Sequence, residues 1–205
     1  MVKSMEILQN VVSPFWLNIT GKEERFMDLK MIKDHFNLPD KSYKELARHL
    51  RLVEVKEDEL PALHEMQVKS FMPLYEKYHD ECSPAIESID RIKARFAAEN
   101  RKYYFITMDG ARVGVINIGN NDPNEKKISF ISPLFILPEF QNRGIGYVAI
   151  QQAFQMLPEV TTWKLETILQ EKGNCHLYEK CGFIRTGEEQ VINDEMTLIM
   201  YELQK

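Results

Sequence analysis

The stretch LFILPEFQNRGIG, residues 134–146, decides the fold. Its first four residues are apolar and run into Pro138, which ends a strand. A short loop with glycine at 144 and 146 follows, and the apolar pattern of residues 144–157 then indicates a helix. The start of a helix offers unpaired N–H groups and a partial positive charge, and glycine lets that backbone approach a ligand closely. The segment predicts either a diphosphate-binding loop that needs no metal or a glycine-rich turn without a ligand.

The surrounding sequence predicts a sheet. Aromatic and β-branched residues fill 102–108 and 112–118, and the Asp109-Gly110 pair between them is typical of a two-residue hairpin turn. A third β-branched run covers 127–137. Further strands are expected over 52–55, 162–168, 183–186 and 196–203.

Helical patterns alternate with these strands. One helix begins near Asp58, a favoured N-cap residue, and another begins at Ser83-Pro84, because proline suits the first helical position. Residues 174–181 form a short helix that ends at Gly182. This order of elements predicts a mixed α/β domain.

Residues 1–51 differ from the rest of the chain. A helix is expected over 22–36, a break at 37–40, and a second helix from the capping-box pattern at Ser42 to Leu50. Two helices around a turn also fit a DNA-binding helix-turn-helix, but residues 22–51 carry only 8 positive against 6 negative side chains. We therefore favour a helical extension packed on the main domain.

The composition is that of a soluble globular protein. The 205 residues include 26 Lys and Arg against 31 Asp and Glu, a net charge of −5, and 44% are hydrophobic. This balance argues against binding of nucleic acid through bulk charge. The start of the chain does not resemble a signal peptide, and no apolar run approaches the roughly 20 residues of a membrane span. We expect a cytoplasmic protein without a membrane partner.

The chain has three cysteines, Cys82, Cys175 and Cys181, and no CxxC pair. Their number and spacing fit neither a disulfide framework nor a zinc site, so no metal is expected. An acyl-cysteine mechanism would need an activated thiolate, and nothing in the sequence requires one.

A second motif, LYEKCGF, lies at residues 177–183. Together with the Q-x-x-G-x-G string at 141–146, it resembles the two signatures of the GNAT acetyltransferase superfamily, and the expected element order resembles that of the family too. The resemblance covers residues 52–205 and leaves 1–51 as an N-terminal helical extension of unknown role. It implies a mixed α/β (α+β) GNAT fold, in which helices flank a central, mostly antiparallel and splayed sheet.

The resemblance implies acetyl-CoA as the co-substrate, with no metal. The backbone of the strand before the glycine loop would pair with the pantetheine arm, as an unpaired strand edge can. The loop would bind the pyrophosphate through its N–H groups, with side-chain contacts from Gln141 and from Arg143, which could equally be a surface residue without a ligand. The cofactor-binding residues implied are Phe135, Ile136, Leu137, Gln141, Asn142, Arg143, Gly144, Ile145, Gly146 and Tyr147.

Asn174 is a further candidate contact with CoA. Family members often have asparagine seven residues before the motif tyrosine, where this chain has Glu171, whereas Asn174 lies four residues before. Either Asn174 contacts the pantetheine arm from a remodelled loop, or it caps the following helix, which we slightly favour.

Tyr178 matches the tyrosine that family members use as a general acid. A phenol near the departing thiolate can donate a proton to it, and the alternative is a ring that only packs against CoA. The acceptor amine must also lose its proton, because an alkylamine has a pKa of about 10.4. Glu166 and Glu139 are the candidate bases, and each could instead be a solvated surface carboxylate.

The implied activity is direct transfer of an acetyl group to a primary amine of a small molecule or peptide. Residues 71–81 mix aromatic and acidic side chains where the family selects its acceptor, so they could attract a cationic amine; a helix followed by a polar loop explains them as well. Two alternatives stay open: a non-catalytic acyl-CoA-binding sensor or regulatory module, and a two-domain protein that binds DNA or protein. The family also suggests a homodimer.

Overall fold

The computed structural model describes residues 40–98, 100–120 and 125–205. The chain divides into two compact units, 1–37 and 38–205, and the description concerns the second. The helix expected over 22–36 lies outside the described residues. No helix within the described ranges is long and apolar enough to cross a membrane.

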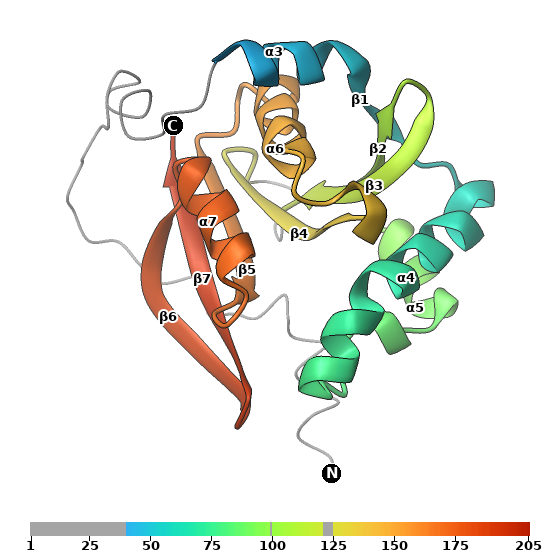
Figure 1. Ribbon diagram of the computed structural model, residues 1–205, viewed down its shortest axis with the longest axis vertical. Coiled ribbons are helices and arrows are strands. Elements are labelled where there is room, and N and C mark those ends of the chain that lie inside the picture. The colour runs from blue at the N-terminus through green and yellow to red at the C-terminus, as the bar shows by residue number, and fades with distance from the viewer. Residues whose placement is uncertain (1–39, 99, 121–124) are drawn as a thin grey trace. The chain divides into compact units, whose positions relative to one another are not determined.

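A seven-stranded sheet forms the centre of this unit (Figure 1). Its strand order is β1-β2-β3-β4-β5-β7-β6, and all described neighbours are antiparallel except β4 and β5. The strands are β1 (Leu50–Glu54), β2 (Arg101–Met108), β3 (Ala111–Gly119), β4 (Ile128–Ile136), β5 (Thr162–Ile168), β6 (Ile184–Asn193) and β7 (Met196–Gln204). The mixed, mostly antiparallel architecture predicted from the sequence is confirmed.

The hairpin of β2 and β3 confirms the predicted turn. Met108 pairs with Ala111, and the two turn residues have positive φ, 48° at Asp109 and 86° at Gly110. Two successive left-handed residues match the right-handed twist of the flanking strands, which is why this dipeptide favours a two-residue hairpin.

Helices cover both faces of the sheet (Figure 1). They are α3 (Asp40–His49), α4 (Leu60–Tyr78), α5 (Ile89–Phe96), α6 (Ile145–Met156) and α7 (Lys172–Lys180). α4 and α5 share one apolar core with β2–β4, which includes Leu63, Phe105 and Phe135. α6 and α7 share the other core, around the fully buried Trp163, and α3 packs against it through Tyr43 and other apolar side chains.

The end of the expected extension is built into the sheet. Leu50 is the first residue of β1, is fully buried, and accepts a hydrogen bond on its carbonyl from Gln152 Nε2 of α6 at 2.9 Å. Residues 40–51 therefore pack with the sheet and α6.

The predicted start of a helix at Ser83-Pro84 is wrong. A single 3-10 turn, Pro84–Ile86, stands there, capped by a hydrogen bond from Ala85 N to Ser83 Oγ, and α5 begins only at Ile89. The backbone is extended at Glu87, which ends the turn and lets this side chain enter a buried polar network.

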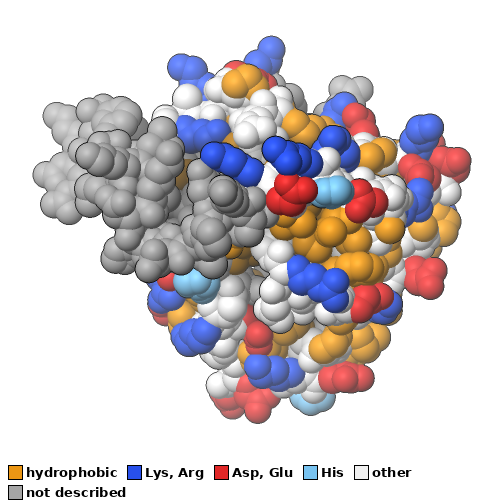
Figure 2. All heavy atoms as spheres, turned by 45° about the horizontal axis from the view of Figure 1, so that its top comes forward, with side chains coloured by type: hydrophobic (Ala, Val, Ile, Leu, Met, Phe, Trp, Pro, Cys, Tyr) orange, Lys and Arg blue, Asp and Glu red, His pale blue; other side chains and the backbone are white. Residues whose placement is uncertain are grey.

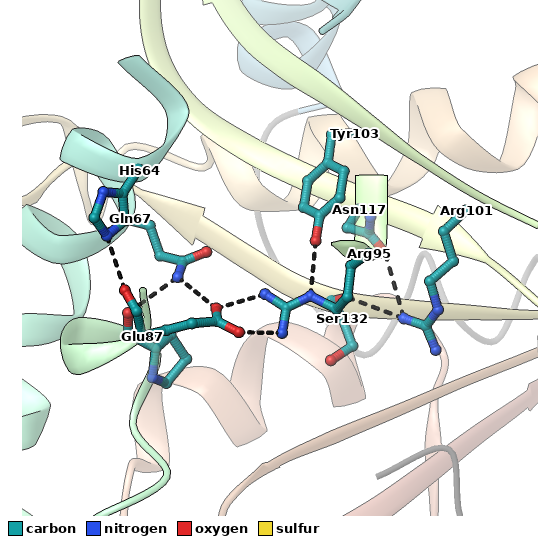
Figure 3. A network of polar contacts seen from close by, with 9 residues as sticks. His64, Gln67, Glu87, Arg95, Arg101, Tyr103, Asn117 and Ser132 are labelled. Atoms are coloured by element: carbon teal, nitrogen blue, oxygen red, sulfur yellow. Dashed lines mark hydrogen bonds and ion pairs between the residues drawn. The ribbon is translucent and has the colours of Figure 1, made fainter. Parts of the chain in front are cut away.

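That network joins α4, α5 and β2 (Figure 3). The Glu87 carboxylate accepts hydrogen bonds from Gln67 Nε2 at 2.9 Å and from both Nη atoms of Arg95. Arg95 Nε also donates to the Tyr103 hydroxyl at 3.1 Å. Because Gln67 and Tyr103 are almost fully buried, this network fixes α4 and α5 on the sheet through polar as well as apolar contacts.

β4 and β5 pair over only three positions and then separate. Ile128, Ser129 and Phe130 pair with Thr162, Trp163 and Lys164, and no later pair joins the two strands. Beyond Phe130, β4 pairs with β3 and with no other strand among the described residues. The splay expected of the fold is therefore present between these two central strands.

Candidate active site

The loop between β4 and α6 has a backbone conformation that favours glycine at position 144. The Pro138–Phe140 turn follows β4, Asn142 and Gly144 have φ of 58° and 77°, and α6 starts at Ile145. A positive φ costs a side-chain-bearing residue on the order of 1–2 kcal/mol, so glycine suits position 144.

The N-terminus of α6 is open. No side chain caps it, and its first turn contains no acidic residue within the described part of the chain. The amide of Gln141 donates to Ile136 O at 2.9 Å, and Arg143 Nη2 donates to Glu139 O at 2.8 Å, so both side chains brace the loop backbone. The result is an ordered loop in front of a helix end that can accept an anion.

The two glycines of the loop have different neighbours. A Cβ on Gly144 would lie 2.7 Å from Tyr43 Cε1 of α3, and a Cβ on Gly146 would lie 3.1 Å from Leu177 Cδ2 of α7. Gly144 therefore allows close approach of α3, whereas Gly146 allows α6 to pack on α7. The sequence pointed to glycine for ligand approach and did not reveal these packing roles.

A hollow of about 470 Å³ adjoins the loop. It is lined by Tyr43, Leu46 and His49 of α3, by Met108 and Asp109 of the hairpin, and by Arg143. His49 lies between two carboxylates, with its Nδ1 2.8 Å from Asp109 Oδ1 and its Nε2 3.5 Å from Glu45 Oε1. Figure 2 shows this face, with apolar side chains gathered beside a histidine that has an acidic side chain on either side.

The strand predicted to pair with pantetheine borders the splay. The ring of Phe135 is buried under α4, where Phe71 meets it edge-on with the centroids 5.6 Å apart. Ile136 packs with the α6 core on the opposite face, and Leu137 N donates to Val113 O at 2.9 Å. The side chains of Phe135 and Ile136 are thus held by the two cores, and beyond Phe130 the β5-facing edge of β4 pairs with no strand of the described ranges.

Tyr178 lies on α7 in the core between this helix and the sheet. It is 7% exposed, with ring centroids 6.1 Å from those of Phe183 and of Tyr201. Burial, and then the thiols of Cys181 and Cys175, raise the pKa of the Tyr178 phenol above its usual range. The phenol therefore stays protonated at neutral pH, as a proton donor must.

The buried cysteines are structural. Burial raises the pKa of the Cys181 thiol to about 12. Cys175 Sγ lies 3.8 Å from the carbonyl oxygens of Ile168 and Leu169, as a weak hydrogen-bond donor. Because its pKa is raised, the Cys181 thiol is not an activated nucleophile.

Glu166 and Tyr178 lie on opposite faces of the sheet. Trp163, Leu165 and Thr167 of β5 are buried and alternate with half-buried residues, so Glu166 points away from α6 and α7. Burial and then the nearby Glu188 raise the pKa of the Glu166 carboxyl. A joint role in one reaction would therefore place these two residues on either side of the sheet, and the sequence did not reveal this separation.

Glu139, the other candidate base, is paired with a cation. Its Oε1 lies 2.7 Å from Lys69 Nζ, and this contact lowers the pKa of the exposed Glu139 carboxyl. A carboxylate that is stabilised in its charged form is a weaker base.

The capping role considered for Asn174 is wrong. α7 begins at Lys172 after Glu171, and Asn174 is an exposed residue inside its first turn. The sequence missed the role of Glu171, whose carboxylate accepts hydrogen bonds from the Tyr78 hydroxyl at 2.6 Å and from Lys77 Nζ at 2.7 Å. The substitution of glutamate for the family's usual asparagine was the signal that could have found it.

This contact joins the end of α4 to the start of α7. Burial disfavours the ionised form of Glu171, but the hydrogen bonds from Lys77 and Tyr78 outweigh it and lower the pKa of this carboxyl. Asn193 Nδ2, at the β6–β7 turn, donates to Tyr78 O at 2.9 Å. The end of α4, the start of α7 and the β6–β7 hairpin therefore meet at Tyr78.

The structure thus places the β4 edge, the glycine loop and Tyr178 around α6 and α7, and leaves Glu166 on the other face. Asn174 is near the start of α7, on its exposed side. Among the described residues, no group of three or more His, Cys, Asp and Glu side chains could hold a metal ion.

Comparisons with known proteins agree with this geometry. The model of the Acetyltransferase (GNAT) family matches residues 60–183. A solved acetyltransferase from Thermus thermophilus is 20% identical, with a TM-score of 0.61, over 76% of this chain and 97% of that chain. No curated protein sequence matches.

Two further solved structures have printed substrates. A spermidine N-acetyltransferase from Vibrio cholerae, in complex with CoA and spermine, is 17% identical, with a TM-score of 0.60, over 77% of this chain and 96% of that chain. The ribosomal-protein-S18-alanine N-acetyltransferase from Escherichia coli is 16% identical, with a TM-score of 0.59, over 76% and 93%. At these identities the likeness shows a shared fold.

Proposed function

The chain belongs to the GNAT acetyltransferase family, and we propose that it transfers an acetyl group from acetyl-CoA to a primary amine of a small molecule or peptide. The observation that carries the proposal is the uncapped N-terminus of α6, which follows a strand whose β5-facing edge has no pairing partner beyond Phe130 within the described residues. A phosphate-bearing ligand with a long amide arm fits these two features together.

The binding role of the loop and strand follows from their chemistry. Backbone N–H groups of residues 141–147 would hold the pyrophosphate, and the β4 edge at 135–137 would pair with the pantetheine amides. Gln141 and Arg143 keep the loop in its binding conformation through their backbone contacts. Asn174 remains a candidate contact near the start of α7.

The reaction needs one proton donor and one proton acceptor. The neutral amine attacks the acetyl carbonyl, a C–N bond forms, the C–S bond breaks, and the sulfur leaves as a thiolate. Tyr178, which is protonated at neutral pH, donates its phenolic proton to that thiolate as the C–S bond breaks. The amine's proton passes to Glu166, directly or through water.

Glu166 suits this second role because of its surroundings. Its raised pKa makes it a stronger base than an exposed carboxylate, and its place on the face away from α6 lets the amine approach from the side opposite the pyrophosphate. An alkylamine that arrives protonated, with a pKa of about 10.4, is drawn to such a carboxylate.

The other expectations stay predictions. The acceptor is an amine of a small molecule or a peptide, as printed for the spermidine and ribosomal-protein acetyltransferases of the same fold. Cytoplasmic location and a homodimer are expected, and neither nucleic acid nor a membrane is expected as a partner. Sedimentation of the purified chain measures its oligomeric state.

A free-thiol release assay tests the activity. The protein is incubated with acetyl-CoA and separate panels of polyamines, aminoglycosides, amino acids and peptides, and we expect amine-dependent release of CoA. Isothermal titration with acetyl-CoA is measured in parallel. Binding of acetyl-CoA with no turnover on any amine would overturn the proposed catalysis and support an acyl-CoA-binding module, and no binding at millimolar acetyl-CoA would overturn the whole proposal.

A further inference from the structure

The helix α4 is held on the sheet in two different ways along its length. Its N-terminal half is anchored by apolar packing, because Leu60 and Leu63 are buried members of the core that α4 shares with β2–β4. The residues that it buries further along are Gln67, Ser70 and Tyr78, and all three are polar. Apolar packing acts over a broad surface, whereas a hydrogen bond is lost when its two groups separate or turn. The C-terminal half of α4 is therefore the half that can leave the sheet more easily.

Pro73 divides these two halves. A proline inside a helix has no N–H to donate to the carbonyl four residues earlier, here that of Lys69, and its ring crowds this carbonyl. Two residues before it, Phe71 still packs on the anchored core, edge-on to the ring of Phe135. A helix bends most readily where proline interrupts its backbone hydrogen bonds. Pro73 is therefore placed as a hinge between the anchored half and the half held by polar contacts.

We call residues 74–83, from this hinge to the turn that starts at Pro84, the α4 flap. The far end of the flap is fixed, because Pro84 O accepts a hydrogen bond from Gln67 Nε2 of the anchored half at 3.0 Å. Within the flap, α4 ends at Tyr78, and His79 reverses the chain with a left-handed φ of 49°. A segment that is fixed at both ends can move as one unit when a few residues at those ends change their backbone angles.

Three polar contacts, which we call the latch, connect the α4 flap to α7 and to the β6–β7 hairpin. The Glu171 carboxylate accepts hydrogen bonds from the Tyr78 hydroxyl at 2.6 Å and from Lys77 Nζ at 2.7 Å. Asn193 Nδ2 donates to Tyr78 O at 2.9 Å. Tyr78 is 3% exposed, yet it belongs to neither apolar core of the described residues. The latch therefore consists of directional contacts that break together when the flap moves away.

The anchored half and the latch contact the two strands that separate. Phe71 contacts Phe135 of β4, whereas the latch contacts Glu171, which follows β5. Beyond Phe130, these two strands have no paired residues within the described ranges. α4 therefore runs from one of the separated strands to the end of the other, on the face of the sheet toward which Glu166 points (Figure 1).

We propose that the α4 flap opens about Pro73 to admit the acceptor amine to the face of the sheet that carries Glu166, and closes again through the latch. The inference rests on the proposed function and extends it, because it assigns the route of the acceptor to one movable segment. The start of α6, where acetyl-CoA is expected, packs in the core on the opposite face. A change in the latch should therefore affect the acceptor and leave acetyl-CoA unaffected.

Two variants loosen the latch and leave the apolar cores intact. Tyr78→Phe removes the hydroxyl that donates to Glu171. Asn193→Asp removes the Nδ2 donor but keeps the Oδ1 atom, which accepts a hydrogen bond from Glu195 N at 2.9 Å inside the hairpin turn. Tyr75→Phe is the matched control, because Tyr75 lies in the flap and its hydroxyl makes no hydrogen bond among the described contacts.

Hydrogen exchange of the full chain without ligand measures the opening. The amides of residues 74–80 should exchange about tenfold faster in both latch variants, while those of residues 64–69 stay within about twofold of wild type. Tyr75→Phe should exchange like wild type over both ranges. Pro73→Ala restores the missing N–H and should slow exchange over residues 74–80 about threefold or more, because it stiffens the hinge.

Steady-state kinetics tests what the opening does. The amine is the fastest one among the polyamines, aminoglycosides, amino acids and peptides of the thiol-release assay. Tyr78→Phe and Asn193→Asp should raise the KM for this amine about threefold or more, because the flap closes less firmly over it. The KM for acetyl-CoA should stay within about twofold.

Each part of the inference has a result that would overturn it. Wild-type exchange over residues 74–80 in both latch variants would mean that the latch does not hold the flap, and equally faster exchange over residues 64–69 would mean that α4 moves as a whole. Unchanged exchange in Pro73→Ala would remove the hinge. A KM for acetyl-CoA that rises as much as that for the amine would contradict a separate route for the acceptor. If wild type acetylates no amine, the proposed function and the admission role both fail, while hydrogen exchange still decides whether the flap opens.

Discussion

The helices α6 and α7 lie on the same face of the sheet, but their N-termini differ in the side-chain contacts that the fold gives them. The start of α6 has no capping side chain and no acidic residue in its first turn, within the described ranges. The start of α7 follows Glu171, whose carboxylate is occupied by Tyr78 and Lys77 of α4. In the described part of the chain, the start of α6 therefore has no side-chain partner, whereas the residue before α7 is bound to α4.

This difference suits the two helices to different roles. Through its open end and the glycine before it, α6 is suited to binding, whereas α7 is tied to α4 at its start and presents Tyr178 two turns later. A helix that positions a proton donor benefits when contacts with the rest of the fold fix its N-terminus. A helix that binds an anion at its N-terminus needs that end free of a protein carboxylate.

The largest expected effect distinguishes a catalytic role of Tyr178 on α7 from a binding role of α6. Tyr178→Phe should lower kcat about 10²- to 10³-fold, because the thiolate loses its proton donor, while the affinity for acetyl-CoA stays unchanged. Thiol-release assays and isothermal titration measure the two quantities. Equal kcat in variant and wild type would leave the ring of Tyr178 with packing as its only role.

Glu166→Gln should lower kcat/KM about 100-fold at neutral pH. The raised pKa of Glu166 means that the carboxyl holds its proton to higher pH than usual, so wild-type activity should rise with pH through that raised pKa, and the variant should lack this rise. A pH profile of kcat/KM checks it.

Glu188→Gln sharpens this test. Because the charge of Glu188 contributes to the raised pKa of Glu166, its removal should move the acidic limb of the profile to lower pH without abolishing it. An unshifted limb would assign the titration to another group.

The next largest effect is expected from a side chain added at the N-terminus of α6. Gly144→Ala should weaken acetyl-CoA binding about tenfold, because the new methyl group strains a φ of 77° and displaces Tyr43. Gly187→Ala is the matched control, since Gly187 has a φ of 89° with nothing near its Cβ position. Similar binding loss in both variants would contradict a specific role for the Gly144 contact.

The smallest effect comes from the locked start of α7. Tyr78→Phe should lower the free energy of unfolding by about 1 kcal/mol at neutral pH, through loss of one hydrogen bond to a carboxylate. Because the pKa of Glu171 is lowered in the folded protein, this contribution is present above its unfolded pKa and is lost as the pH falls through its folded pKa. Urea unfolding at neutral and acidic pH measures it.

Tyr75→Phe serves as the control for this comparison. Tyr75 lies one turn earlier on the same helix and meets His79 edge-on, with no hydrogen bond from its hydroxyl among the described contacts. A loss as large as that in Tyr78→Phe would show that the Glu171 contact adds nothing specific.

Most of the fold could be predicted from local sequence patterns. The Asp109-Gly110 turn, the strand at 162–168 and the strand–loop–helix unit around Gly144 all depend on neighbours in sequence, and all are confirmed. Ser83-Pro84 misled because the same residues that start a helix also cap a single 3-10 turn. The 3-10 turn does not continue as a helix because the backbone is extended at Glu87. The Glu87 side chain instead contacts Gln67 and Arg95, which lie 20 and 8 residues away in the sequence.

The site was harder to predict than the fold. The glycine motif and Tyr178 could be placed on their elements, because each lies in a local signature. The contact of Tyr78 with Glu171 spans 93 residues, and that of Lys180 with Tyr43 spans 137. Nothing in a local pattern encodes such pairs, because they arise only when separate helices pack on one sheet.

The separation of β4 from β5 after Phe130 has a consequence for stability. Beyond Phe130, the β5-facing edge of β4 has no pairing partner among the described residues, and its peptide groups could pair with an extended ligand. A co-substrate with an extended amide arm would supply that partner and complete the sheet. The protein should therefore melt at a temperature that climbs with acetyl-CoA concentration, and acetylpantetheine without its nucleotide should already produce part of the rise.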